Sequence, residues 1–106
     1  MSIKGSERQE KIIQAWSQAL ADHVHKLDIK QAEDYVRRSL TEAELATEQK
    51  LYEMDHRDLS DPGKAQFVGK VVSLLYNHIS QEFNVENAES LRKLLIDVYQ
   101  QFPDHS

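Results

Sequence analysis

The 106-residue chain contains no cysteine and has little glycine and proline. Without cysteine it can form no disulfide, thiolate metal site or cysteine nucleophile, so its chemistry must rest on nitrogen and oxygen groups. No uncharged apolar run approaches the roughly 18 residues of a membrane span, and residues 1–6 lack the apolar core of a signal peptide. We therefore expect a cytoplasmic protein with no membrane segment.

Neither glycine nor proline occurs between Gly5 and Pro62. This absence favours helices joined by few irregular loops, and no β-hairpin turn signal is present. The composition, 40% hydrophobic and 29% charged, is that of an ordinary globular chain. We expect one all-α domain over residues 1–106, folded as a compact four-helix bundle, with residues 1–5 and 103–106 frayed.

The first helix is predicted over about residues 7–26. Ser6 and Gln9 have the spacing of a capping box, and apolar residues then recur at three- and four-residue steps. Asp28 and Gln31 form a second, weaker capping pattern. A bend is therefore expected just before Asp28, although a helix that continues through it is the alternative.

The second helix is predicted to be long, from about 29 to 57. Thr41 and Glu44 resemble another capping box and could begin a new helix. The apolar stripe from Ile29 to Met54 nevertheless stays in phase across them, which favours one continuous amphipathic helix.

The third helix is predicted over about residues 62–83, beginning at Pro62. Its apolar residues spread over an arc of about 200°, wider than an ordinary surface helix needs, so we expect it to be the central helix. A fourth amphipathic helix carries apolar residues from Leu91 to Phe102 and ends at Pro103.

The formal net charge of −5 comes from 13 basic and 18 acidic residues. This balance disfavours direct binding of nucleic acid. Most of the acidity lies in residues 28–61, where Glu44, Glu48 and Asp55 follow one edge of the predicted long helix. Such a ridge beside an apolar stripe could dock a protein partner, and a solvated helix face explains it equally well.

Two features favour self-association: the third helix has a wider apolar arc than one neighbour can cover, and Ile96 of the fourth helix lies opposite Leu91 and Leu94. Gly69 and Ser73, one turn apart, would also admit another helix at close range. A two-fold homodimer is the default closed assembly. A monomer whose own helices cover these residues is the alternative.

His78 falls inside the apolar arc of the third helix, with Glu82 four residues later on the same face. A histidine and a glutamate at this spacing can form a hydrogen bond. Such a pair is more often structural, and the alternative is that His78 and Glu82 bind a small ligand.

No metal, cofactor or catalytic site is predicted. Glu53 and His56 have a spacing found in carboxylate-bridged metal sites, but the motif occurs once and such sites need it twice. His23 and His25 diverge by about 200° on a helix, so they cannot share an ion unless the helix ends early. No nucleophile elbow or phosphate-binding glycine loop is present, so we do not expect an enzyme.

By elimination, the sequence favours a small acidic interaction module that acts as an adaptor, regulator or inhibitor, with Glu44, Glu48, Asp55 and Ile96 at the partner interface. One alternative is a ligand- or metal-binding bundle that uses His78 and Glu82. A second alternative is a DNA-binding transcriptional regulator. The sequence does not identify the partner or the ligand.

Overall fold

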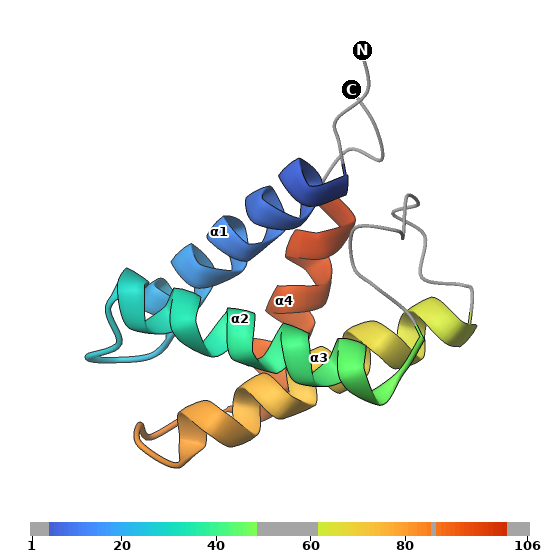
Figure 1. Ribbon diagram of the computed structural model, residues 1–106. Coiled ribbons are helices and arrows are strands. Elements are labelled where there is room, and N and C mark those ends of the chain that lie inside the picture. The colour runs from blue at the N-terminus through green and yellow to red at the C-terminus, as the bar shows by residue number, and fades with distance from the viewer. Residues whose placement is uncertain (1–4, 49–61, 86, 102–106) are drawn as a thin grey trace.

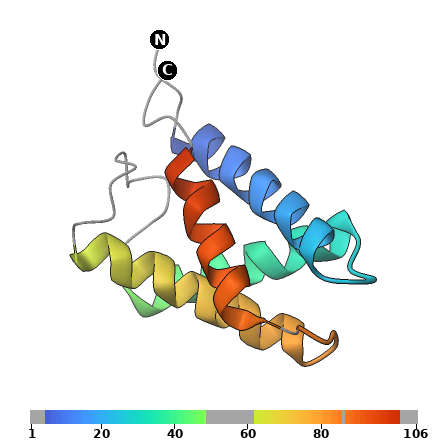
Figure 2. The same cartoon turned by 180° about the vertical axis from the view of Figure 1, so that it is seen from behind.

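The computed structural model describes residues 5–48, 62–85 and 87–101, which form four α-helices and no strand. The helices are α1 (Gly5–His23), α2 (Ile29–Ala46), α3 (Pro62–Ser80) and α4 (Ala88–Gln101). They pack in a ring in which α1 and α3 each contact both α2 and α4 (Figures 1 and 2). The predicted all-α four-helix architecture is confirmed. None of the described helices combines the length and hydrophobicity needed to cross a membrane.

The bend between α1 and α2 lies where the capping pattern predicts it. The Asp28 carboxylate accepts a hydrogen bond from the Gln31 backbone N–H at 2.8 Å, and the Gln31 side chain accepts from the Asp28 N–H at 3.3 Å. This capping box satisfies two backbone donors at the start of α2. Helix α1 is shorter than predicted, since it ends at His23.

The prediction of one helix from 29 to 57 is wrong at its C-terminal end. Helix α2 continues through Thr41 and Glu44, as the apolar phase predicts, but it ends at Ala46. Thr47 takes an extended conformation, and both its backbone N–H and its hydroxyl donate to the Ala43 carbonyl, at 3.0 and 2.9 Å. This local capping competes with helix propagation and is invisible to apolar periodicity.

The core is a single cluster built from all four helices. Trp16 of α1 is fully buried, and its indole N–H donates to the Leu95 carbonyl of α4 at 2.8 Å. Helix α3 contributes six buried apolar side chains. It ends at Ser80 rather than 83, and it packs between α2 and α4 as one member of the ring rather than at its centre.

Two serines are buried in the core and differ in their hydrogen bonds. Ser17 Oγ donates to the Ile13 carbonyl at 2.7 Å. Ser39 Oγ on α2 has no hydrogen-bond partner in the described part of the chain. A buried hydroxyl without a partner costs about 1–3 kcal/mol.

We therefore expect Ser39→Ala to raise the free energy of unfolding by about 1–2 kcal/mol, because it removes that penalty and introduces a better helix former. Urea unfolding followed by circular dichroism measures the change. Ser17→Ala is the matched control: it removes a satisfied hydrogen bond, so it should be neutral or destabilising by up to about 1 kcal/mol. Equal stabilities of the two variants would contradict the expectation.

Candidate functional site

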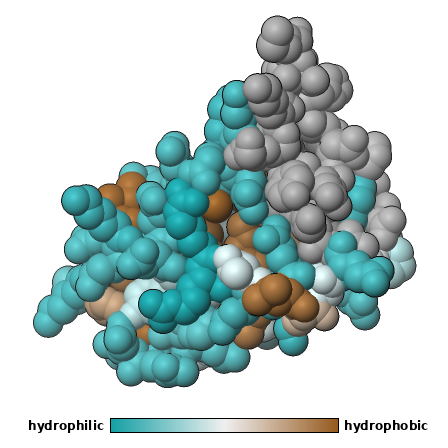
Figure 3. All heavy atoms as spheres, in the orientation of Figure 1, coloured by the Kyte–Doolittle hydropathy of each residue, from teal (hydrophilic) through white to brown (hydrophobic). Residues whose placement is uncertain are grey.

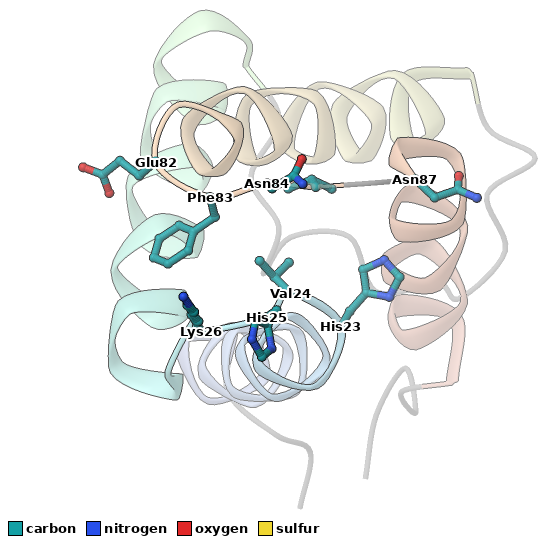
Figure 4. Close-up of a pocket in the computed structure, with 9 residues that line it drawn as sticks. His23, Val24, His25, Lys26, Glu82, Phe83, Asn84 and Asn87 are labelled. Carbon is teal, nitrogen blue, oxygen red and sulfur yellow. The ribbon is translucent and has the colours of Figure 1, made fainter.

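The α1–α2 and α3–α4 loops lie at the same end of the bundle and enclose a cavity of about 540 Å³, which we call the loop-end cavity (Figure 4). Residues 23–26 line one side, and residues 82–85 with Asn87 line the other. The ring packing places these two loops opposite each other, because α1 and α3 both end here while α2 and α4 both begin here.

The floor of the loop-end cavity is apolar and anchored in the core. Val24 is 3% exposed, while Phe83 and Val85 are partly buried against the core cluster. The Phe83 ring packs edge-on against Tyr35 of α2, with 6.3 Å between ring centroids. Figure 4 shows Val24 and Phe83 directed into the space between the loops. Contact with the core therefore fixes this surface.

The rim of the loop-end cavity carries hydrogen-bond donors. His23, His25, Lys26 and Asn84 are all exposed there, and none of their side chains forms a hydrogen bond or ion pair within the described residues. Among the described lining residues, Glu82 alone is acidic, and its carboxylate points away from the loop-end cavity (Figure 4). The rim thus offers unpaired donors and positive charge.

Lys26 has a left-handed backbone conformation, with φ of 72°. It lies in a turn closed by the hydrogen bond from the Leu27 N–H to the Val24 carbonyl, at 3.3 Å. Glycine is favoured at such a position because a β-carbon there costs about 1 kcal/mol. The chain thus carries a cation at a position where backbone stability alone favours glycine.

A second hollow, of about 820 Å³, lies along the outer face of the first half of α3, and we call it the α3 groove. Phe67 of α3 is among its lining residues and is itself fully buried in the core. Small residues make up much of its lining: Ala46, Gly63, Ala65, Gly69 and Ser73.

Two cations line the α3 groove. Lys70 of α3 and Arg92 of α4 are both exposed, and neither forms an ion pair with another described residue. Arg92 crosses α3 at Gly69, where a β-carbon would lie 3.4 Å from Arg92 Nη2. The absence of a side chain at position 69 therefore lets the guanidinium lie close over the helix.

The predicted partner-binding residues are not gathered on one described surface. Glu44 is partly buried and accepts a hydrogen bond from Gln9 Nε2 of α1 at 3.4 Å. Glu48 is exposed beyond the end of α2, and Asp55 lies outside the described residues. Ile96 is partly buried, packs against the core cluster and also lines a shallow hollow on α4 with Glu89 and Arg92.

The predicted pair of His78 and Glu82 is not formed. Since α3 ends at Ser80, Glu82 does not share a helical face with His78 and instead lines the loop-end cavity. His78 Nε2 lies 2.5 Å from Glu42 Oε2 of α2. This contact connects α2 to α3 and gives His78 a structural partner that no local spacing could identify.

The carboxylates of α1 and α2 also hold helices together. Arg37 makes a two-pronged contact with Glu10 of α1, at 2.6 and 2.8 Å, and a further contact with Glu33 at 3.2 Å. The hydrogen bonds from Arg37 lower the pKa of the Glu10 carboxyl below its ordinary value. The ion pair between Glu10 and Arg37 therefore connects α1 to α2.

No three His, Asp or Glu side chains converge as a metal site within the described ranges, and Glu53 and His56 lie outside them. The loop-end cavity was missed by sequence reasoning. The relevant sequence signal was the pair His23 and His25, which would diverge by about 200° if α1 continued through both. Because α1 ends at His23, His25 lies in the following turn, and both residues line the same cavity.

The Glu10–Arg37 contact predicts a loss of stability in acid. Because the pKa of Glu10 is lowered in the folded state, its contribution is complete above the unfolded value of about 4.3 and disappears as the pH falls through the folded value. The side chains are 42% and 46% exposed, so screening limits the effect to less than about 1 kcal/mol.

Urea unfolding of wild type and Glu10→Gln between about pH 7 and pH 3 tests this sign, and the difference in stability should shrink toward zero in acid. Glu48→Gln, at an exposed carboxylate beyond α2, is the control and should differ little from wild type throughout. A Glu10→Gln effect that does not depend on pH would refute the assignment.

Comparisons of the chain with models of protein families, with curated proteins and with solved structures found no match.

Proposed function

We propose that this protein is a small interaction module, an adaptor, regulator or inhibitor, that binds an acidic helical segment of a protein partner in the α3 groove. The observation that carries the proposal is the combination of a small-residue lining with two exposed cations, Lys70 and Arg92, that form no ion pair with another described residue. A cytoplasmic location, expected from the sequence, belongs to the same proposal.

Charge determines the kind of partner. Glu33, Glu42 and Glu44 of α2 already contact groups within the bundle. Helix α3 contains no carboxylate, and the charged side chain that it contributes to the groove lining is Lys70. Helix α4 adds Arg92 and Lys93 together with Glu89 and Asp97. Electrostatic complementarity in the groove favours an acidic partner instead of the basic partner that the predicted ridge would attract.

The shape of the α3 groove suits a helix. Glycine, alanine and serine side chains leave room for another backbone to approach, and contact distances between helices depend on side-chain size. Leu45, next to the groove residue Ala46, is 83% exposed. Figure 3 shows hydrophobic surface over the C-terminal end of α2. An amphipathic helix could cover this apolar surface while its carboxylates reach the cations.

A second copy of the chain fits the groove less well. Symmetric pairing through this face would bring Lys70 and Arg92 close to the same residues of the other copy. Like charges in contact oppose association. The predicted homodimer thus gains no support from the α3 groove, and the proposal commits to a different protein as the occupant.

Binding of two synthetic peptides tests the proposed partner chemistry. Both are amphipathic helices with the same alanine and leucine face, one flanked by glutamates and the other by lysines. Fluorescence anisotropy should show the glutamate peptide binding at least about tenfold more tightly. Lys70→Glu combined with Arg92→Glu should abolish this preference.

Lys11→Glu combined with Lys30→Glu is the matched control, since it makes the same charge change at exposed lysines outside the groove. It should keep most of the preference. Equal binding of both peptides, or equal losses in the two double variants, would overturn the proposal. Tight, salt-sensitive binding of a short DNA duplex in place of the peptide would favour the DNA-binding alternative.

Gly69→Ala should change the stability of the fold and the binding of the peptide in opposite directions. The added methyl group makes an ordinary contact with Arg92, and alanine is the better helix former by about 1 kcal/mol, so the melting temperature should rise by several degrees. The same methyl group occupies the groove lining, so binding of the glutamate peptide should weaken about tenfold. Ser73→Ala adds no bulk and should bind as wild type. Unchanged binding by Gly69→Ala would place the partner elsewhere.

A further inference from the structure

The loop-end cavity is separate from the α3 groove and shares no lining residue with it. We propose that it binds a small monocarboxylate with an aromatic or aliphatic body. The site combines an anchored apolar floor with donors from one loop that form no hydrogen bond within the described residues, while the Glu82 carboxylate points away (Figure 4). Nothing in this inference depends on the proposed interaction with a protein partner.

The apolar floor selects the body of the ligand. Val24 is buried in the core while it faces the cavity, and Phe83 is held by its edge-on contact with Tyr35. These side chains cannot turn away from the space without disturbing core packing. An apolar ligand body placed between them would bury hydrophobic surface from both loops. The volume of about 540 Å³ lies within the range of small-molecule sites.

The rim selects the charged group. Lys26 and His23 lie on opposite sides of Val24 in Figure 4, and His25 follows in the same turn. The Lys26 ammonium group and the imidazole N–H groups of the same loop are donors of the kind that a carboxylate accepts. A cationic ligand would meet Lys26 and no inward-facing carboxylate among the described lining residues, because Glu82 points outward. The charge pattern therefore favours an anion.

The backbone at Lys26 supports a role for its side chain in binding. Its left-handed conformation is one that glycine adopts more easily, so a lysine there weakens the fold. The lysine side chain makes no hydrogen bond or ion pair within the described residues that could offset this cost. A bound carboxylate would supply the missing partner.

Titration of ¹⁵N-labelled protein with benzoate and with octanoate, followed by NMR, tests the site. We expect saturable shifts concentrated at Val24, Phe83 and Val85. Benzyl alcohol and benzylamine, which keep the aromatic body but not the negative charge, should bind at least about tenfold more weakly than benzoate. Inorganic phosphate, which has charge but no apolar body, should also bind more weakly.

Four variants test whether Lys26 supplies the positive charge. Lys26→Met should weaken benzoate binding at least about tenfold, whereas Lys30→Met, at an exposed lysine of α2, should stay within about twofold of wild type. Lys26→Gly should lose binding equally while its melting temperature rises, which shows that the loss does not come from unfolding. The Lys70→Glu, Arg92→Glu variant should bind benzoate as wild type, so failure at the groove is distinguishable from failure here.

Several results would overturn the inference. The first is the absence of a saturable shift with benzoate or octanoate up to about 10 mM. The second is that benzyl alcohol or phosphate binds as tightly as benzoate. The third is that Lys26→Met binds benzoate as tightly as wild type does.

Discussion

The arrangement of the bundle depends on the contact between Trp16 and α4. The indole is fully buried, and its N–H donates to the carbonyl of Leu95, 79 residues away in the sequence. A buried indole needs both apolar packing and a hydrogen-bond acceptor, and this position supplies both. The contact joins the first helix to the last and closes the ring that α2 and α3 complete.

Closing the ring also creates the features that can carry function. It brings the α1–α2 and α3–α4 loops to one end, where residues far apart in the chain enclose the loop-end cavity. It places Arg92 of α4 across Gly69 of α3, which gives the α3 groove a cation that α3 itself does not supply. Both hollows are therefore consequences of the helix packing and not of a local motif.

The net charge gives a misleading picture of the surface. Glu10 and Glu33 bind Arg37, and Glu42 binds His78, so acidic groups of α1 and α2 serve contacts inside the bundle. Lys70 and Arg92 of the α3 groove are exposed and form no ion pair with another described residue. The formal net charge therefore does not describe every part of the surface equally, because the local potential depends on how the charges are distributed.

The sequence by itself determined the helical class, the α1–α2 bend and the faces that form the core. These follow from short-range regularities, such as the capping box of Asp28 and the apolar spacing that buries Trp16. Periodicity could not show that Thr47 would cap α2 at Ala46, because this side-chain contact with Ala43 competes with an apolar pattern that continues.

Tertiary structure alone decided that His78 contacts Glu42, that Gln9 donates a hydrogen bond to Glu44, and that both hollows exist. Each of these joins residues on different helices or loops. Their separation in space is set by packing of the whole core, and no local spacing in the chain encodes that separation.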